Sequence, residues 1–224
     1  SDAAIGKYRG EIPFSIIKGL IKAESDFNPK AVNADVDAPG GGPKHGLMQP
    51  TKTGLKDLQI ERASTATLLD PEESIRIGCT ILLEYLRRLR SDFPGAFDKP
   101  LEQDANAAAV LAHAYTSGYA ITKQLLKSAG STSYRVVAAA NGQDRAIAKR
   151  WSDRVLDAAR KYGYTQILPA SGALVAPIGG GGGALPVPPP GAGKGNTWLW
   201  LLGAAAVGGG ALYFTTKQKK RRHA

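Results

Sequence analysis

The composition changes abruptly after Leu168, and this change limits where a hydrophobic core can form. Residues 169–196 contain long runs of glycine and proline, such as Gly179 to Gly183, and a single charged side chain. A segment of this kind has too few apolar side chains to bury, so it is predicted to be a linker, flexible in its glycine run and stiffer in its proline run. A folded domain is therefore expected within residues 1–168, an ordinary size for one domain.

An uncharged segment, residues 197–216, follows the linker. As a helix of about 20 residues it would span roughly 30 Å, which is the thickness of the hydrocarbon layer of a membrane. Its large aromatic residues gather at its two ends, as in the interfacial belts of membrane helices: Trp198, Trp200, Tyr213 and Phe214. We therefore predict a transmembrane helix over 197–216. A buried soluble helix is the alternative, but three consecutive glycines disfavour a helix in water.

The charges around this segment predict its orientation. Residues 217–224 carry five basic side chains and no acidic one, so the positive-inside rule places this basic tail in the cytoplasm and residues 1–196 on the cell-wall side. Small residues four apart, such as Ala204 and Gly208, would allow self-association in lipid. Residues 1–11 are polar and do not resemble a secretory leader. We expect either that a leader was removed before Ser1 or that another route, such as a phage particle or an export apparatus, delivers the protein.

Charge and cysteine content exclude some classes of function. The net charge is +10, but all 19 acidic residues lie before residue 169 and balance most of the basic residues there. Basic residues do not form a stripe interleaved with aromatic ones, so specific nucleic-acid binding is not expected. Cys79 is the only cysteine, which excludes an intramolecular disulfide within one chain. It lies in an apolar run, where a thiol is a poor nucleophile.

Helical periodicity dominates the first 168 residues, and strand signals are scarce. Helices are predicted over four ranges: 12–25, 70–89, 104–127 and 143–162. Pro13 suits the first turn of the first helix, and Asp70-Pro71 combines a capping residue with a first-turn proline for the second. A loop rich in glycine and proline is predicted over 35–45. The fold class is therefore mainly α.

Glu24 is the strongest candidate for catalysis. It lies at the end of the first predicted helix, on the same stripe as the apolar residues Ile17, Leu20 and Ile21. A carboxylate on a buried face loses water, so its pKa rises. A protonated carboxyl at neutral pH is what a general acid needs to protonate a glycosidic oxygen, as in lysozyme. The sequence therefore predicts a sugar-cleaving enzyme with Glu24 as proton donor.

Two further segments are predicted to complete the site. Gly46 permits close approach of the backbone, and Gln49 offers a donor and an acceptor for sugar groups. Met48 is either a pocket wall or a core residue. Tyr115, in the alanine-rich helix, is either a core residue or a hydroxyl that reaches the carboxylate or the substrate.

These residues, in this order, resemble the soluble lytic transglycosylase family. The resemblance covers roughly residues 10–162 and rests on four short motifs: Glu24-Ser25, Gly46-Leu47-Met48-Gln49, Asp70-Pro71 followed by Ile75 and Gly78, and Ala114-Tyr115-x-x-Gly118. It implies a lysozyme-like catalytic domain that cleaves the β-1,4 bond between N-acetylmuramic acid and N-acetylglucosamine in peptidoglycan. It also implies that Glu24 acts first as acid and then as base, closing a 1,6-anhydro ring, with no metal or cofactor. The residues it implies in substrate binding are Ser25, Gly46, Leu47, Met48, Gln49, Tyr115 and Gly118.

The sequence departs from the family pattern at two places. Thr116 stands where the tyrosine motif usually has asparagine, and Trp151 stands where a late motif usually has tyrosine, four residues before Val155. An indole cannot accept a hydrogen bond as a phenol does. Tyr134 or Tyr115 is therefore a candidate for the missing contact.

Several alternatives remain open from the sequence. A hydrolytic muramidase similar to goose-type lysozyme would need a second carboxylate, for which Asp35 and Asp37 are the candidates. A membrane-anchored peptidoglycan-binding or structural protein whose catalysis has lapsed is another. A head on a flexible arm beside a membrane suggests local opening of the wall for phage DNA entry or for a transport assembly. Virion or secretion components are then expected partners, although ordinary bacterial wall remodelling fits as well.

Overall fold

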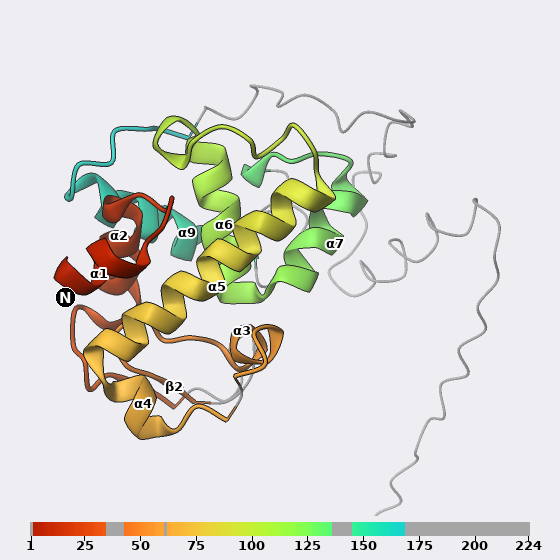
Figure 1. Cartoon of the computed structure of the whole chain (residues 1–224). Helices are drawn as coiled ribbons and strands as arrows, with labels where there is room; N and C mark the ends of the chain where they lie inside the picture. Colours follow the sequence, from red (N-terminus) through yellow and green to blue (C-terminus); the bar gives the residue numbers. More distant parts are fainter. Residues whose placement is uncertain (1, 35–42, 61, 136–144, 169–224) are drawn as a thin grey trace, which may run out of the picture. The chain divides into compact units, whose positions relative to one another are not determined.

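A computed structural model describes residues 2–34, 43–60, 62–135 and 145–168, and for residues 145–152 it describes only the backbone. The described part is mainly helical, as predicted, with one pair of short strands (Figure 1). Its elements are α1 (Asp2–Tyr8), α2 (Phe14–Ser25), β1 (Val32–Asn33), β2 (Lys44–His45), α3 (Lys52–Asp57), α4 (Thr65–Leu69), α5 (Pro71–Asp92), the 3-10 turn η1 (Leu101–Gln103), α6 (Ala105–Ser117), α7 (Tyr119–Ala129) and α9 (Arg145–Arg160).

The first predicted helix is present as α2, with its ends shifted by a few residues. Pro13 precedes the first helical residue, where its missing N–H costs no hydrogen bond. The helix ends at Ser25 because Asp26 adopts a left-handed backbone conformation with φ of 53°. The N–H group of Asp26 donates to the carbonyl of Lys22 and closes the last turn. Glu24 therefore lies in the final turn of α2.

The long helix α5 runs through the middle of the fold and contacts α1, α3, α4, α6 and α7 (Figure 1). Its start is the predicted one: the carboxylate of Asp70 accepts a hydrogen bond of 2.8 Å from the N–H group of Glu73, and Pro71 occupies the first turn. One face of α5 is fully buried and includes Ile75, Cys79 and Leu82. Burial raises the pKa of the Cys79 thiol to about 12, which agrees with a packing role for this residue.

The prediction of one alanine-rich helix over 104–127 is wrong, because the structure has two helices there. α6 ends at Ser117 and α7 begins at Tyr119. Gly118 between them has φ of 89°, a conformation that glycine adopts without steric cost and that stops an α-helix. Every residue of α6 is buried, so this helix is the centre of the core.

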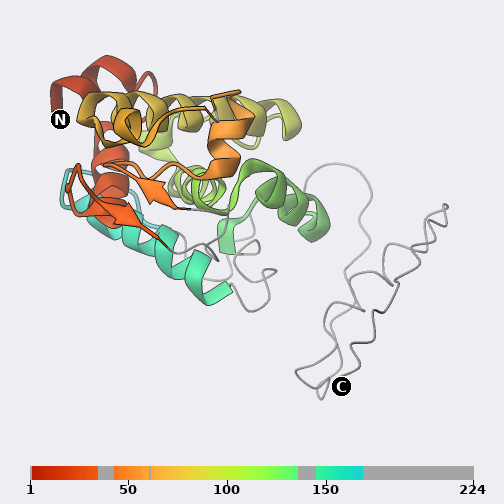
Figure 2. The same ribbon diagram turned by 90° about the horizontal axis from the view of Figure 1, so that it is seen from below.

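Three short helices, α1, α3 and α4, were not predicted. α3 and α4 have five or six residues each and are capped by the side chains of Thr51 and Ser64. Such helices are too short to produce a periodic apolar pattern. The end of the predicted loop over 35–45 is strand β2, which pairs antiparallel with β1 (Figure 2).

α2 and α9 pack closely side by side, as Figures 1 and 2 both show. The approach depends on Gly19, because a Cβ atom there would lie 2.4 Å from the carbonyl oxygen of Val155. α9 lies within the predicted range 143–162. Its position against α2 brings its described side chains next to the end of α2 that carries Glu24.

The predicted linker over 169–196, the predicted transmembrane helix over 197–216 and the basic tail over 217–224 lie outside the described residues. In the ranges that the structure describes, no helix is both long enough and apolar enough to cross a membrane.

Candidate active site

Glu24 occupies the end of α2, on the face that the sequence predicted to be buried. Ile17, Leu20 and Ile21 are completely buried on this helix. Burial raises the pKa of the Glu24 carboxyl to about 7, while the positive charges of Lys44 and Arg154 act in the opposite direction. The residue still keeps partial exposure to solvent. The two facts are compatible, because protein atoms that crowd a carboxyl exclude bulk water even when one edge remains accessible.

No ion pair neutralises Glu24 within the described residues. The nearest basic residue on the same helix end, Lys22, is paired with Asp26 instead. A direct partner would have stabilised the carboxylate and lowered its pKa. Because Glu24 has no such partner among the described residues, desolvation has the largest effect on its pKa. The carboxyl is therefore present in both protonation states at neutral pH.

Ser25, predicted to bind substrate, turns its hydroxyl into the helix. The Oγ atom donates a hydrogen bond of 3.1 Å to the carbonyl of Ile21, and only 9% of the residue is exposed. This bond uses the donor of the hydroxyl within α2. In this geometry Ser25 shapes the last turn on which Glu24 lies.

The Gly46–Gln49 segment is buried between α4 and α5. Gly46 has φ of 79°, and a Cβ atom there would lie 1.8 Å from the carbonyl oxygen of Leu68, so glycine is required by the packing. Leu47 and Met48 are buried. The side chain of Met48 fills the space over Gly78, where a Cβ atom would approach within 2.5 Å of the Met48 methyl group. The structure thus places Met48 in the core, one of the two roles considered for it.

Gln49 joins this segment to the turn that follows α2. Its Nε2 atom donates to the carbonyls of Ala31 and Gly46, at 3.0 and 2.9 Å. Its Oε1 atom is buried and accepts no hydrogen bond from any described residue. Both donors of the amide are therefore occupied, and only its acceptor oxygen remains available.

Tyr115 connects α6 with the same segment. Its hydroxyl donates a hydrogen bond of 2.8 Å to the carbonyl of Met48. Burial raises the pKa of the Tyr115 phenol well above its usual range, and the negative charge of Glu24 adds to this effect, so the two side chains are close enough to interact. The hydroxyl is thus committed to the backbone of Met48. Gly118, the last residue of the tyrosine motif, separates α6 from α7.

The structure describes some of the remaining candidate residues and not others. Tyr134 is buried, and its N–H group donates to the side-chain oxygen of Asn106 at 2.7 Å. Thr116 donates to the carbonyl of Ala112 within α6. The side chain of Trp151 and the residues Asp35 and Asp37 lie outside the described part of the structure.

Lys44 and Arg154 are the residues at this site that the sequence reasoning missed. Lys44 lies on β2 and is only 5% exposed, and Arg154 lies on α9 and donates to the carbonyl of Ala23 at 3.3 Å. They are separated from Glu24 by 20 and 130 positions in the sequence. No local pattern could have linked them to it, because a lysine in a glycine-rich loop and an arginine on an amphipathic helix are usually solvated.

The described residues contain no group of three histidine, cysteine, aspartate or glutamate side chains that could hold a metal ion. The chemistry that the described site supports is proton transfer by one carboxyl group. A carboxyl with a raised pKa is the general acid that cleavage of a glycosidic bond requires, so the site is compatible with the class of enzymes that cleave such bonds by acid–base catalysis.

Comparison with protein families identifies the family. The model of the transglycosylase SLT domain matches residues 3–150, about two thirds of the chain. The protein therefore belongs to this family of lysozyme-like domains, whose members are lytic transglycosylases that cleave peptidoglycan. None of the curated proteins compared with the chain matches its sequence.

Proposed function

We propose that this protein is a peptidoglycan lytic transglycosylase that cleaves the β-1,4 bond between N-acetylmuramic acid and N-acetylglucosamine. Glu24 acts as its single acid and base. The observation that carries this proposal is the desolvated, unpaired carboxyl of Glu24 with a pKa of about 7. A group with this pKa is protonated in about half of the molecules at neutral pH, so it is suited to both proton-transfer steps.

In the first step, protonated Glu24 donates its proton to the glycosidic oxygen. The bond between this oxygen and C1 of the muramoyl residue breaks, and its electron pair leaves with the N-acetylglucosamine hydroxyl. In the second step, the Glu24 carboxylate accepts the proton of the muramoyl 6-hydroxyl, whose oxygen attacks C1 and closes the 1,6-anhydro ring. Glu24 regains its proton and no water is consumed.

The charges around Glu24 favour this mechanism over hydrolysis. A hydrolytic inverting enzyme needs a second carboxylate about 6.5–9.5 Å from the acid to activate water. Within the described residues, both charged side chains that act on Glu24 are cations. A hydrolase using Asp35 or Asp37 is the competing hypothesis.

Product analysis separates the two reactions. Purified sacculi treated with the full chain are expected to release muropeptides ending in 1,6-anhydromuramic acid, as measured by mass spectrometry, and the Glu24→Gln variant is expected to release none. Reducing-end muramic acid as the main product would instead establish hydrolysis. Absence of any cleavage by the wild-type protein, with binding to sacculi retained, would establish a binding protein.

The composition of residues 169–224 supports a proposal about the setting of this activity. A head on a Gly/Pro linker beside a membrane segment at 197–216 would cut only the peptidoglycan within reach of that membrane. We propose that such local cutting opens the wall for phage DNA entry or for a transport assembly. Immunodetection in purified phage particles and in host envelope fractions tests this role. Absence from particles would reject the virion version.

A further inference from the structure

We propose that Lys44 and Arg154 are positioning residues that stabilise the ionised form of Glu24 without forming an ion pair with it. The proposal rests on the function proposed above, because it concerns the state of Glu24 between the two proton transfers. Arg154, on α9, donates to the carbonyl of Ala23 at the end of α2, and Lys44 lies on β2, which pairs with β1, the strand that follows α2. Neither forms an ion pair with a carboxylate among the described residues.

Lys44 is held in place by the strand pair. It lies opposite Asn33 in the antiparallel register, and the N–H group of Gly46 donates to the carbonyl of Ala31 at 2.9 Å, which extends the same pairing. Only 5% of Lys44 is exposed. Lysine is rarely buried to this extent, because its ammonium loses hydration. The negative charge that forms on Glu24 during the reaction provides a functional reason to keep a lysine here.

Arg154 is fixed by the close packing of α9 on α2. Gly19 of α2 packs against the backbone of Val155, the residue that follows Arg154 on α9. This contact leaves no room for a Cβ atom on residue 19 and sets the distance between α2 and α9. At that distance an Nη atom of Arg154 donates to the carbonyl of Ala23, the residue before Glu24. The last carbonyls of a helix carry partial negative charge, so a cation at this end is favourable. The guanidinium is therefore anchored to the backbone beside Glu24 rather than to its carboxylate.

Among the described residues, the other titratable groups near Glu24 supply no positive charge that could stabilise its carboxylate. Tyr115 interacts with Glu24 from α6 and stays neutral, because burial raises the pKa of its phenol. Lys22, two residues before Glu24, is engaged by Asp26. Within the described residues, Lys44 and Arg154 are thus the only charges that act on the Glu24 carboxyl.

The arrangement suits a carboxyl that must gain and lose the same proton in each cycle. A direct ion pair would hold Glu24 ionised before the substrate arrives and would remove the acid. Burial without any cation would make the carboxylate too costly to form. Cations that lie near the carboxyl but beyond ion-pair distance lower that cost while leaving the starting proton in place, which agrees with a pKa of about 7.

The test is the pH dependence of 1,6-anhydromuropeptide release from purified sacculi by the full chain. Removing a cation by Lys44→Met or Arg154→Met is expected to move the alkaline limb of the rate profile upward by about half a pH unit or more, with the larger shift for Lys44. At pH 6 the rate per molecule is expected to fall several-fold, because the carboxyl becomes a weaker acid. Lys44→Arg and Arg154→Lys keep the positive charge, so the alkaline limb of the rate profile is expected to stay at the wild-type pH.

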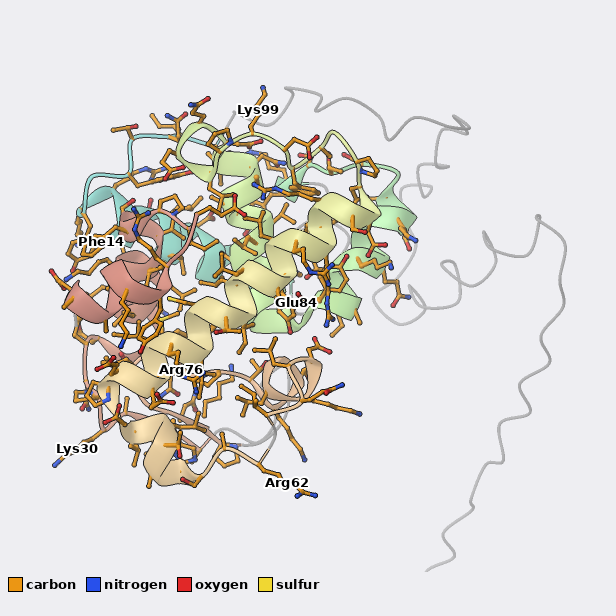
Figure 3. The ribbon with its side chains drawn as sticks, viewed as in Figure 1. Phe14, Lys30, Arg62, Arg76, Glu84 and Lys99 are labelled. Carbon is orange, nitrogen blue, oxygen red and sulfur yellow. The ribbon has the colours of Figure 1, made fainter. Side chains whose placement is uncertain are left out.

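Lys30→Met is the matched control, because Lys30 is an exposed lysine of the turn between α2 and β1 and points away from the body of the domain (Figure 3). This variant removes the same charge and is expected to leave the profile unchanged. An unshifted limb in Arg154→Met, or a shift equal to that of Lys30→Met, would overturn the inference even if Lys44→Met fails to fold. Activity retained by Glu24→Gln in the same assay would overturn the proposed function itself.

Discussion

The end of α2 and the middle of α5 carry glutamates whose pKa values move in opposite directions. Hydrogen bonds from Arg87, together with a bond from Arg88, lower the pKa of Glu84 to about 2, against the opposing effect of partial burial. Glu84 accepts these bonds at 2.7–2.8 Å on the outer side of α5 (Figure 3). Glu24 also has two cations nearby but no bond to either, and its pKa rises to about 7. Desolvation decides the form of the Glu24 carboxyl, whereas direct hydrogen bonds from arginine decide the form of the Glu84 carboxyl.

Helix geometry explains why the two sites differ. Side chains three and four positions apart are neighbours on a helix, so Arg87 and Arg88 face Glu84 along α5. The corresponding positions after Glu24 are Phe27 and Asn28, which are uncharged and follow the end of α2. Three and four positions before Glu24 lie Ile21 and Leu20, which are apolar and buried. The helix therefore offers Glu24 no local partner, and its cations come from elements that are distant in the sequence.

Exchange of each glutamate for glutamine gives the largest contrast. Glu24→Gln removes the only proposed proton donor and is expected to lower 1,6-anhydromuropeptide release by about 10³-fold or more. Glu84→Gln is the matched control on α5 and is expected to keep the rate within about threefold, because Glu84 lies outside the site. Equal losses in the two variants would mean that both act through stability.

The same two variants are expected to change stability in opposite directions. Glu24 binds its proton more tightly in the folded state, with a pKa of about 7 against an ordinary value of 4.5. The folded state thus holds the extra proton between these values, and wild-type stability falls as the pH rises from about 4.5 to 7. The amide cannot ionise, so Glu24→Gln is expected to be more stable than wild type by about 2–3 kcal/mol at pH 8 and equally stable near pH 4. Urea denaturation at several pH values measures the difference.

The pH dependence of stability that Glu84 causes has the opposite sign. Its lowered pKa contributes stability that is present above pH 4.5 and is lost as the pH falls toward about 2. Glu84→Gln is therefore expected to cost about 1–2 kcal/mol at pH 7, with a cost that stays constant down to about pH 4.5 and decreases below it. A pH-independent difference for either variant would contradict the assigned pKa shifts.

Gly19→Ala tests the packing that brings Arg154 to α2. The added methyl group would overlap the backbone of Val155 and Ala159, so the helices must separate, at a cost of about 2 kcal/mol in the free energy of unfolding. The pH profile of activity is expected to change, while the protonation of Glu84 on α5 is not. Gly6→Ala is the control, because a Cβ atom on Gly6 would meet nothing within 4 Å. A loss in that variant would contradict a local packing effect.

Lys18→Met gives the smallest expected effect. The ammonium of Lys18 is paired with Asp2 and lies 5.3 and 5.6 Å from the ring centroids of Phe27 and Tyr162. Loss of these contacts, which link α2 to the segment after α9, is expected to cost about 1 kcal/mol of stability in thermal or urea denaturation. Lys7→Met removes an exposed ion pair with Glu72 and is expected to show no measurable loss of stability.

The sequence predicted the parts of the fold that depend on strong local patterns. The buried stripe that ends at Glu24 and the cap at Asp70 were found because periodicity and capping chemistry lie within a few residues. The break at Gly118 was missed, since a glycine in an alanine-rich run is compatible with a continuous helix. Lys44 and Arg154 were missed because only the tertiary fold brings them to Glu24. The packing role of Gly46 also depends on a distant residue, Leu68.

The most direct test of the central claim is the titration of the Glu24 carboxyl by carbon-13 NMR. Its resonance can be assigned by its absence in Glu24→Gln. The expected midpoint for Glu24 lies near pH 7, well separated from that of Glu84, which remains ionised down to about pH 2. A midpoint for Glu24 near its ordinary value of 4.5 would show that the carboxyl is ionised at neutral pH and would contradict its role as the proton donor.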